Sequence, residues 1–97
     1  MSITRISEFQ AKQESIEALR NFLISIIHGI KSSQGCESVR LYQSQGDQTK
    51  FTMIEVWNSI DLHQASVKNI PAEQLTAIRP LLASAPSGSY FELIQEK

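Results

Sequence analysis

The stretch FTMIEVWNSID, residues 51–61, decides the fold because it reads as a strand that runs into a helix. Side chains alternate between the two faces of a strand. One face therefore carries Phe51, Met53, Glu55 and Trp57. The other face carries Thr52, Ile54 and Val56. Neither face is polar, so a sheet built on this strand needs a covering layer on both sides. It must also accommodate a glutamate beside the only tryptophan.

Length and composition are those of one small globular domain, residues 1–97. Hydrophobic residues make up 41% of the chain, which is ordinary for such a domain. Nine basic residues stand against ten acidic ones without a basic run, so nucleic acid is not an expected partner. The single cysteine, Cys36, cannot form an internal disulfide, and no Cys/His cluster is present. We therefore expect a reducing compartment and no metal site.

The hydropathy pattern predicts a cytoplasmic protein without a membrane segment. The N-terminal residues MSITRISEF have no basic segment followed by an apolar core, so no signal peptide is evident. The longest apolar patch, residues 22–27, is far too short to span a bilayer.

Periodicity along the chain predicts the element order β-α-β-β-α-(α)-β. The first helix has apolar residues at helical spacing in a single sector, and Gly35 suits the turn after it. The expected strands are residues 3–9, 37–43, 51–57 and 89–95, and the expected helices are residues 13–32, 59–68 and a short one after Pro71. Asn58 or Ser59 suits the cap of the second helix, and Pro80 breaks or kinks the last one.

This order predicts an α+β fold of the ferredoxin-like, split β-α-β type: a four-stranded antiparallel sheet with its helices packed on one face. The opposite face then holds Ile54, Val56 and apolar residues of the other strands. Monomers seldom expose an apolar patch of several hundred Å². We therefore expect a homodimer that pairs sheet against sheet across a two-fold axis.

Several short motifs, in this order along the chain, resemble the antibiotic biosynthesis monooxygenase domain. They are Gly35-Cys36, Phe51…Glu55-Val56-Trp57, Ser59 at the start of a helix, and Pro80-Leu81-Leu82. The resemblance covers essentially the whole chain. It implies a dimeric α/β barrel with a pocket between sheet and helices. Some members of that family oxygenate aromatic polyketides or quinols without metal or flavin, and relatives degrade haem.

The resemblance carries over residue by residue. Trp57 matches the family tryptophan, and Glu55 matches the glutamate two residues before it. Haem-degrading relatives also use an asparagine on the first strand, where Ser7 is the nearest equivalent here. They use a helix histidine where this chain has Ser66, while His63 lies one turn earlier. These departures count against haem degradation, so no cofactor is predicted.

His63 is the candidate catalytic residue. It shares a stripe of the second predicted helix with Ile60, Val67 and Ile70, so its ring is expected to point inward. Histidine titrates near neutral pH, which suits a general base or a hydrogen-bond donor. The alternative is a core histidine whose nitrogens are satisfied by a carbonyl or water.

Glu55 and Trp57 each allow a structural and a functional interpretation. A carboxylate on a covered face needs a partner, either the backbone or a base such as Arg40 or Arg79, unless it holds a proton for chemistry. Trp57 either forms a wall that stacks on an aromatic ligand or is a plain core residue.

The resemblance implies a cofactor-independent monooxygenase acting on a planar aromatic or quinol-type small molecule. His63 would deprotonate the substrate, and the anion would pass an electron to O₂. The expected substrate-binding residues are Trp57, Glu55, Phe51, Met53, Ser7 and Ser66. The alternative function is a non-catalytic dimeric module that binds haem or another small molecule. A third possibility is a pocket filled by the protein's own side chains.

Overall fold

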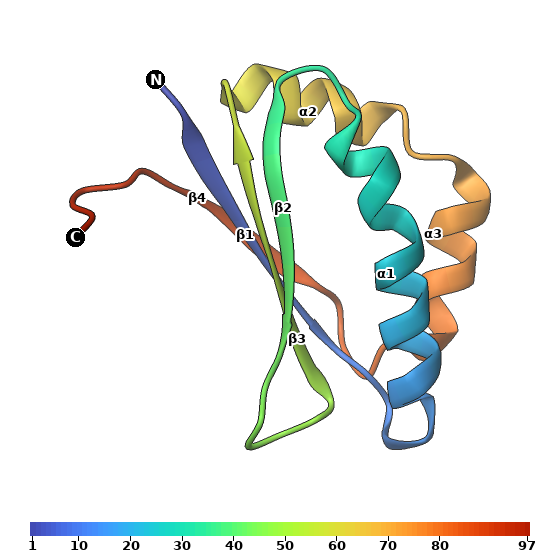
Figure 1. The fold of residues 1–97 in the computed structure, drawn as a ribbon. Helices are drawn as coiled ribbons and strands as arrows, with labels where there is room; N and C mark the ends of the chain where they lie inside the picture. The colour runs from blue at the N-terminus through green and yellow to red at the C-terminus, as the bar shows by residue number, and fades with distance from the viewer.

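A computed structural model describes all residues, 1–97, as four strands and three helices (Figure 1). In chain order these are β1 (Ile3–Gln10), α1 (Ile16–Lys31), β2 (Cys36–Gln43), β3 (Lys50–Trp57), α2 (Ile60–Lys68), α3 (Ala72–Ile78) and β4 (Ser87–Phe91). Short 3-10 turns at Gln13–Ser15 and Arg79–Leu81 precede α1 and follow α3. The strands form one antiparallel sheet in the order β2-β3-β1-β4, with all helices on one side. The predicted ferredoxin-like fold is confirmed.

The core lies between α1 and the central strand β3. Burial along β3 alternates as predicted, with Phe51, Met53, Glu55 and Trp57 buried on the helix side. Leu19 and Leu23, one turn apart on α1, join Phe51, Met53 and Ala11 in a single apolar cluster. Each fully buried leucine contributes about 1.5–3 kcal/mol, so this contact accounts for much of the helix-to-sheet attachment.

Gly35 and Ser59 together fix the end of the sheet where α1 stops and α2 begins. Gly35 has φ +89°, and a Cβ there would lie 2.5 Å from Cδ1 of Leu62. The Asn58 amide donates to the Gly35 carbonyl at 2.8 Å. The Ser59 hydroxyl caps α2 by accepting a hydrogen bond from the Leu62 amide at 3.2 Å. No helix is long and apolar enough to span a membrane.

The last strand is shorter than predicted and lies earlier in the chain. Residues 89–95 were the expected strand, whereas β4 covers Ser87–Phe91. β4 pairs only with β1, and Phe91 already lies opposite Thr4, one residue from the start of β1. Residues after Phe91 therefore have no strand to pair with, and Leu93 and Ile94 are 69% and 86% exposed.

The sheet face away from the helices is covered by no part of the chain (Figure 1). The strand registers place a mixed apolar and polar set on it. Its apolar and aromatic members are Ile6, Tyr42, Ile54, Val56 and Phe91. Tyr42 and Phe91 are about half exposed. We call this surface the open face, and it is the face on which a dimer contact was predicted.

Candidate functional site

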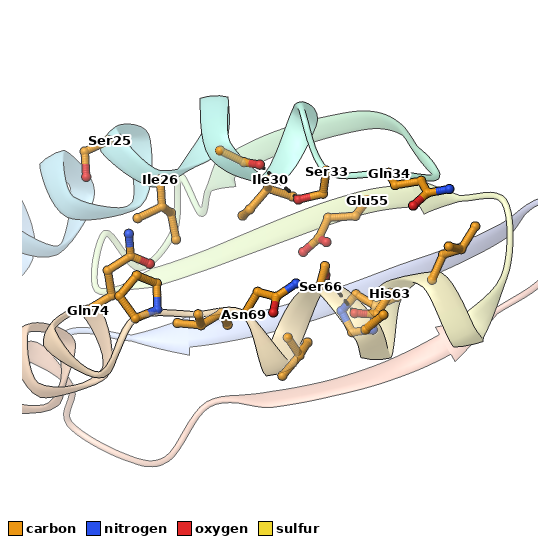
Figure 2. Close-up of a pocket in the computed structure, with 16 residues that line it drawn as sticks. Ser25, Ile26, Ile30, Ser33, Gln34, Glu55, His63, Ser66, Asn69 and Gln74 are labelled. Carbon is orange, nitrogen blue, oxygen red and sulfur yellow. Dashed lines mark hydrogen bonds between the residues drawn. The ribbon is translucent and has the colours of Figure 1, made fainter.

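A cleft of about 450 Å³ lies between α1 and the segment formed by α2 and α3, with β3 as its floor (Figure 2). α1 and the turn after it contribute one wall: Ser25, Ile26, Gly29, Ile30, Ser33 and Gln34. α2, α3 and the turn between them contribute the other: Leu62, His63, Ala65, Ser66, Val67, Asn69, Ile70, Pro71 and Gln74. Glu55 is the only lining residue from the sheet. Its carboxyl group points from β3 into the space between α1 and α2.

His63 is held in place by two aromatic rings and one hydrogen bond. The Ser59 cap places His63 in the first turn of α2, where its side chain is only 7% exposed. Its ring meets those of Trp57 and Tyr90 edge-on, each with centroids 5.3 Å apart. Its Nδ1 lies 2.6 Å from the Tyr90 hydroxyl. Burial lowers the pKa of His63, and the positive charge of Arg5 lowers it further, so the ring is neutral at neutral pH.

Glu55 finds its partner two residues along the same strand face. Its Oε1 accepts a hydrogen bond of 2.8 Å from the indole Nε1 of Trp57. This answers why a glutamate shares a face with the only tryptophan, because a buried indole N–H needs an acceptor. Burial raises the pKa of Glu55, against smaller lowering effects of the Trp57 hydrogen bond and the charge of Arg5.

The predicted basic partners of Glu55 were wrong. Arg40 lies opposite Ile54 in the register, on the open face, and is exposed. Arg79 lies in the 3-10 turn after α3 and makes no ion pair with Glu55. The basic group whose charge acts on Glu55 is Arg5, which pairs with it in the β1–β3 register. The sequence contains one signal for Arg5, because the alternation of ITRISEF places it on the same strand face as Ser7.

Arg5 also packs against Tyr90, the hydrogen-bond partner of His63. Its guanidinium carbon lies 4.7 Å from the centre of the Tyr90 ring, a cation–π contact. Gly88, two residues before Tyr90, makes room for it, because any Cβ at Gly88 would clash with the guanidinium. Arg5 Nε is the one buried side-chain nitrogen or oxygen that lacks a hydrogen-bond partner. The structure thus connects Arg5, Tyr90, His63, Trp57 and Glu55 in one contiguous group.

Three of the predicted site residues line the cleft: His63, Glu55 and Ser66. The Ser66 hydroxyl donates to the His63 carbonyl within α2 at 2.7 Å, so towards the cleft its oxygen can only accept. The stripe predicted to be buried beside His63 is not. Ile60, Val67 and Ile70 are exposed, and the last two form part of the cleft wall. His63 is the only buried residue of α2.

The other four predicted site residues do not line the cleft. Phe51 and Met53 belong to the apolar cluster under Leu19 and Leu23, further along β3. Trp57 is fully buried behind Glu55 and His63, which it contacts. Ser7 lies between Met53 and Gly88 in the sheet register. Alternation along a strand predicts which face a residue occupies, but the position of the helices decides which part of that face stays open.

No group of three or more His, Cys, Asp or Glu side chains is placed to hold a metal ion. The polar chemistry of the cleft therefore rests on Glu55, His63 and the hydroxyl and amide groups of its walls.

A family model described as "Antibiotic biosynthesis monooxygenase" matches residues 2–86, which confirms the resemblance seen in the sequence motifs. No curated protein matches the chain. Among solved structures, Rv0793 from Mycobacterium tuberculosis superposes with a TM-score of 0.85 at 19% identity, covering 99% of this chain and 98% of that one. PA3566 from Pseudomonas aeruginosa has a TM-score of 0.85 at 20% identity, with coverages of 97% and 95%.

SnoaB, a cofactor-independent oxygenase from Streptomyces nogalater, has a TM-score of 0.83 at 15% identity, with coverages of 98% and 95%. At these identities the structural matches demonstrate a shared fold. Residue roles in the cleft have to be argued from the geometry of this chain.

Proposed function

Since the chain belongs to the antibiotic biosynthesis monooxygenase family, we propose that it is a cofactor-independent monooxygenase of planar aromatic or quinol-type small molecules. One observation carries the proposal. Two buried titratable groups, Glu55 and His63, line the same cleft, and burial shifts their pKa values in opposite senses, towards each other. Buried groups with shifted pKa values in a cleft are candidates for proton transfer, and a carboxyl group whose pKa is raised is a stronger base once it is ionised. The cofactor-independent oxygenase with the same fold supports this choice of chemistry.

The proposed reaction needs no redox group from the protein. The cleft takes a proton from an aromatic hydroxyl, and the resulting anion gives one electron to O₂. The substrate radical and superoxide then combine through a new carbon–oxygen bond, and the peroxide loses water to leave a carbonyl. The proton first taken from the hydroxyl protonates the peroxide, and the attacked ring carbon loses its single hydrogen and keeps one oxygen atom. These two hydrogens leave with the second oxygen atom as water. The protein supplies a proton acceptor and a hydrogen-bond donor in a cleft whose walls mix apolar and polar side chains.

We also propose that the working form is a homodimer paired through the open face. The apolar residues of that face, Ile6, Ile54, Val56 and Phe91, have no cover within the chain. Leu93 and Ile94, which follow β4, are also exposed. The cleft lies on the helix side of the sheet, so a dimer of this kind leaves it accessible.

Oxygen uptake with a panel of quinols and polycyclic phenols tests the proposed activity. We expect Glu55→Gln and His63→Ala each to lower kcat/KM by roughly 10²–10⁴, the range for loss of a group that transfers or orients a proton. His28→Ala is the matched control, because His28 is exposed on α1 and does not line the cleft. Wild-type rates in both cleft variants would contradict the proposal.

A binding module without catalysis is the second candidate, and the position of Ser7 favours it. Haem-degrading relatives use an asparagine on the first strand, for which Ser7 is the nearest equivalent in this sequence, and Ser7 does not line the cleft. At the helix position of their histidine this chain has Ser66. Haemin titration distinguishes the two candidates. A Soret shift that is lost in His63→Ala, together with no oxygen uptake on any phenol, would support the binding module.

A further inference from the structure

The two ring nitrogens of His63 have different surroundings. Nδ1 lies 2.6 Å from the Tyr90 hydroxyl, whereas Nε2 has no hydrogen-bond partner in the protein. Arg5 Nε is the only buried side-chain nitrogen or oxygen without a hydrogen-bond partner. Since Nε2 of His63 also has no partner, Nε2 is not buried and must be in contact with solvent. His63 is almost fully buried and lines the cleft, so the cleft is where Nε2 is accessible.

The chemistry of the two groups favours Tyr90 as the donor of this short contact. The Tyr90 hydroxyl has no other hydrogen-bond partner in the protein, so a proton that pointed away from His63 would lack an acceptor there. A phenol is a good donor, and an unprotonated imidazole nitrogen is a good acceptor, so the bond runs from Tyr90 Oη–H to Nδ1. A neutral imidazole carries only one N–H. If Nδ1 accepts, the N–H must be on Nε2.

Arg5 keeps this arrangement in place. Its guanidinium stacks on the Tyr90 ring, and its positive charge opposes a second proton on His63. The titratable groups facing His63 from the packed strands are Arg5 of β1, Glu55 of β3 and Tyr90 of β4. Among these groups Glu55 is the one that lines the cleft, and one of its two carboxyl oxygens has no hydrogen-bond partner. Its Oε1 is held by Trp57, while Oε2 has no partner and is likewise not among the buried unpartnered atoms.

We propose that Tyr90 is a positioning residue that holds His63 as the Nε2–H tautomer, so that His63 is the hydrogen-bond donor of the cleft and Glu55 is its proton acceptor. This inference rests on the proposed function for its chemical meaning. Of the two roles that the sequence allowed for His63, general base and hydrogen-bond donor, it selects the donor.

The assignment narrows the substrate class. A substrate hydroxyl gives its proton to Glu55 Oε2, and the electron pair stays on the substrate oxygen. The His63 Nε2–H donates to an oxygen that carries negative charge, either on the substrate or on the peroxide formed from it. The best ligand therefore has an aromatic hydroxyl together with a second oxygen that accepts a hydrogen bond. Phenols with an adjacent carbonyl or a second hydroxyl belong to this class.

Proton NMR of the ¹⁵N-labelled wild-type chain without ligand tests the tautomer directly. We expect the proton of the Tyr90–His63 bond to show no one-bond coupling to nitrogen, and a separate N–H signal to arise from Nε2. Tyr90→Phe should lose the hydroxyl signal and gain a population with the proton on Nδ1. Tyr42→Phe is the control, because Tyr42 is exposed on the open face and does not contact His63, and it should leave the spectrum unchanged.

A conservative pair of variants tests the assignment of roles. His63→Gln retains an N–H donor but cannot act as a base, so we expect it to stay within about tenfold of wild-type kcat/KM. Glu55→Gln should lose roughly 10²–10⁴. A one-bond coupling on the shared proton, an unchanged spectrum in Tyr90→Phe, or a His63→Gln loss as large as that of Glu55→Gln would overturn the proposal. If no phenol is oxidised at all, the proposed function fails, while the NMR result still decides the tautomer.

Discussion

At the scale of single residues, the site depends on polar groups that burial has shifted from their ordinary chemistry. Glu55 tolerates its position because the Trp57 indole donates to one oxygen, yet burial still raises its pKa. His63 is buried as a neutral ring in contact with Trp57 and Tyr90, since burial lowers its pKa. Burial disfavours the charged form of each group.

Glu55→Gln is expected to stabilise the protein at neutral pH by roughly 0.5–2 kcal/mol. The pKa of Glu55 is raised in the folded state, so between the unfolded and folded pKa values the folded state binds more protons. The contribution of Glu55 to stability therefore falls as pH rises through that window. The amide of glutamine still accepts from Trp57 and has no charge to desolvate.

Urea unfolding across a pH series measures this effect. The wild type should lose stability relative to Glu55→Gln as pH rises from the acid side, and the gap should then level off. Glu92→Gln, an exposed position after β4, is the control and should follow the wild type. Equal stability of Glu55→Gln and the wild type at every pH would contradict the argument.

At the scale of elements, the cleft lies between α1 and the α2–α3 segment, and the turn after α1 packs against the start of α2. Gly35 and Leu62 make that junction, and the Asn58 amide bonds the Gly35 carbonyl across it. Beyond the junction, Ile26 and Ile30 of α1 face Val67 and Ile70 across the cleft. A change at Gly35 should therefore affect both stability and the shape of the cleft.

Gly35→Ala is expected to lower the free energy of unfolding by at least about 1–2 kcal/mol, the cost of a left-handed backbone for a residue with a Cβ. The clash of that Cβ with Leu62 adds to the loss. Gly46→Ala is the matched control, since Gly46 has open space around it and no positive φ, and it should change stability by less than about 0.5 kcal/mol. Chemical denaturation of both variants measures the difference, and equal losses would argue against the junction.

At the scale of the whole molecule, one side of the sheet is covered by helices and the other by nothing in the chain. The open face explains why β3 has apolar residues on both sides: Phe51, Met53 and Trp57 build the interior, while Ile54 and Val56 face outwards. Apolar side chains on a sheet face that nothing in the chain covers, set among polar ones, are typical of a protein–protein contact.

Ile54→Lys is expected to convert a homodimer into a monomer, because a lysine in the centre of the open face would be buried without a partner. Analytical ultracentrifugation at micromolar concentration measures the mass. Ile24→Lys, at an exposed position on α1, is the control and should remain dimeric. A wild-type chain that sediments as a monomer under these conditions would exclude the dimer.

The amino-acid sequence by itself determined the element order, the buried face of β3 and the presence of an uncovered sheet face. Those properties follow from periodicity, which depends on each residue's near neighbours along the chain. It also placed His63, Glu55 and Ser66 among the site candidates. The tertiary structure alone decided that Phe51, Met53, Trp57 and Ser7 lie outside the cleft. It also showed that Tyr90 contacts His63 and that Arg5 contacts Tyr90. The physical reason is that strand register and helix placement join residues far apart in the chain, and such contacts leave no periodic trace in the sequence.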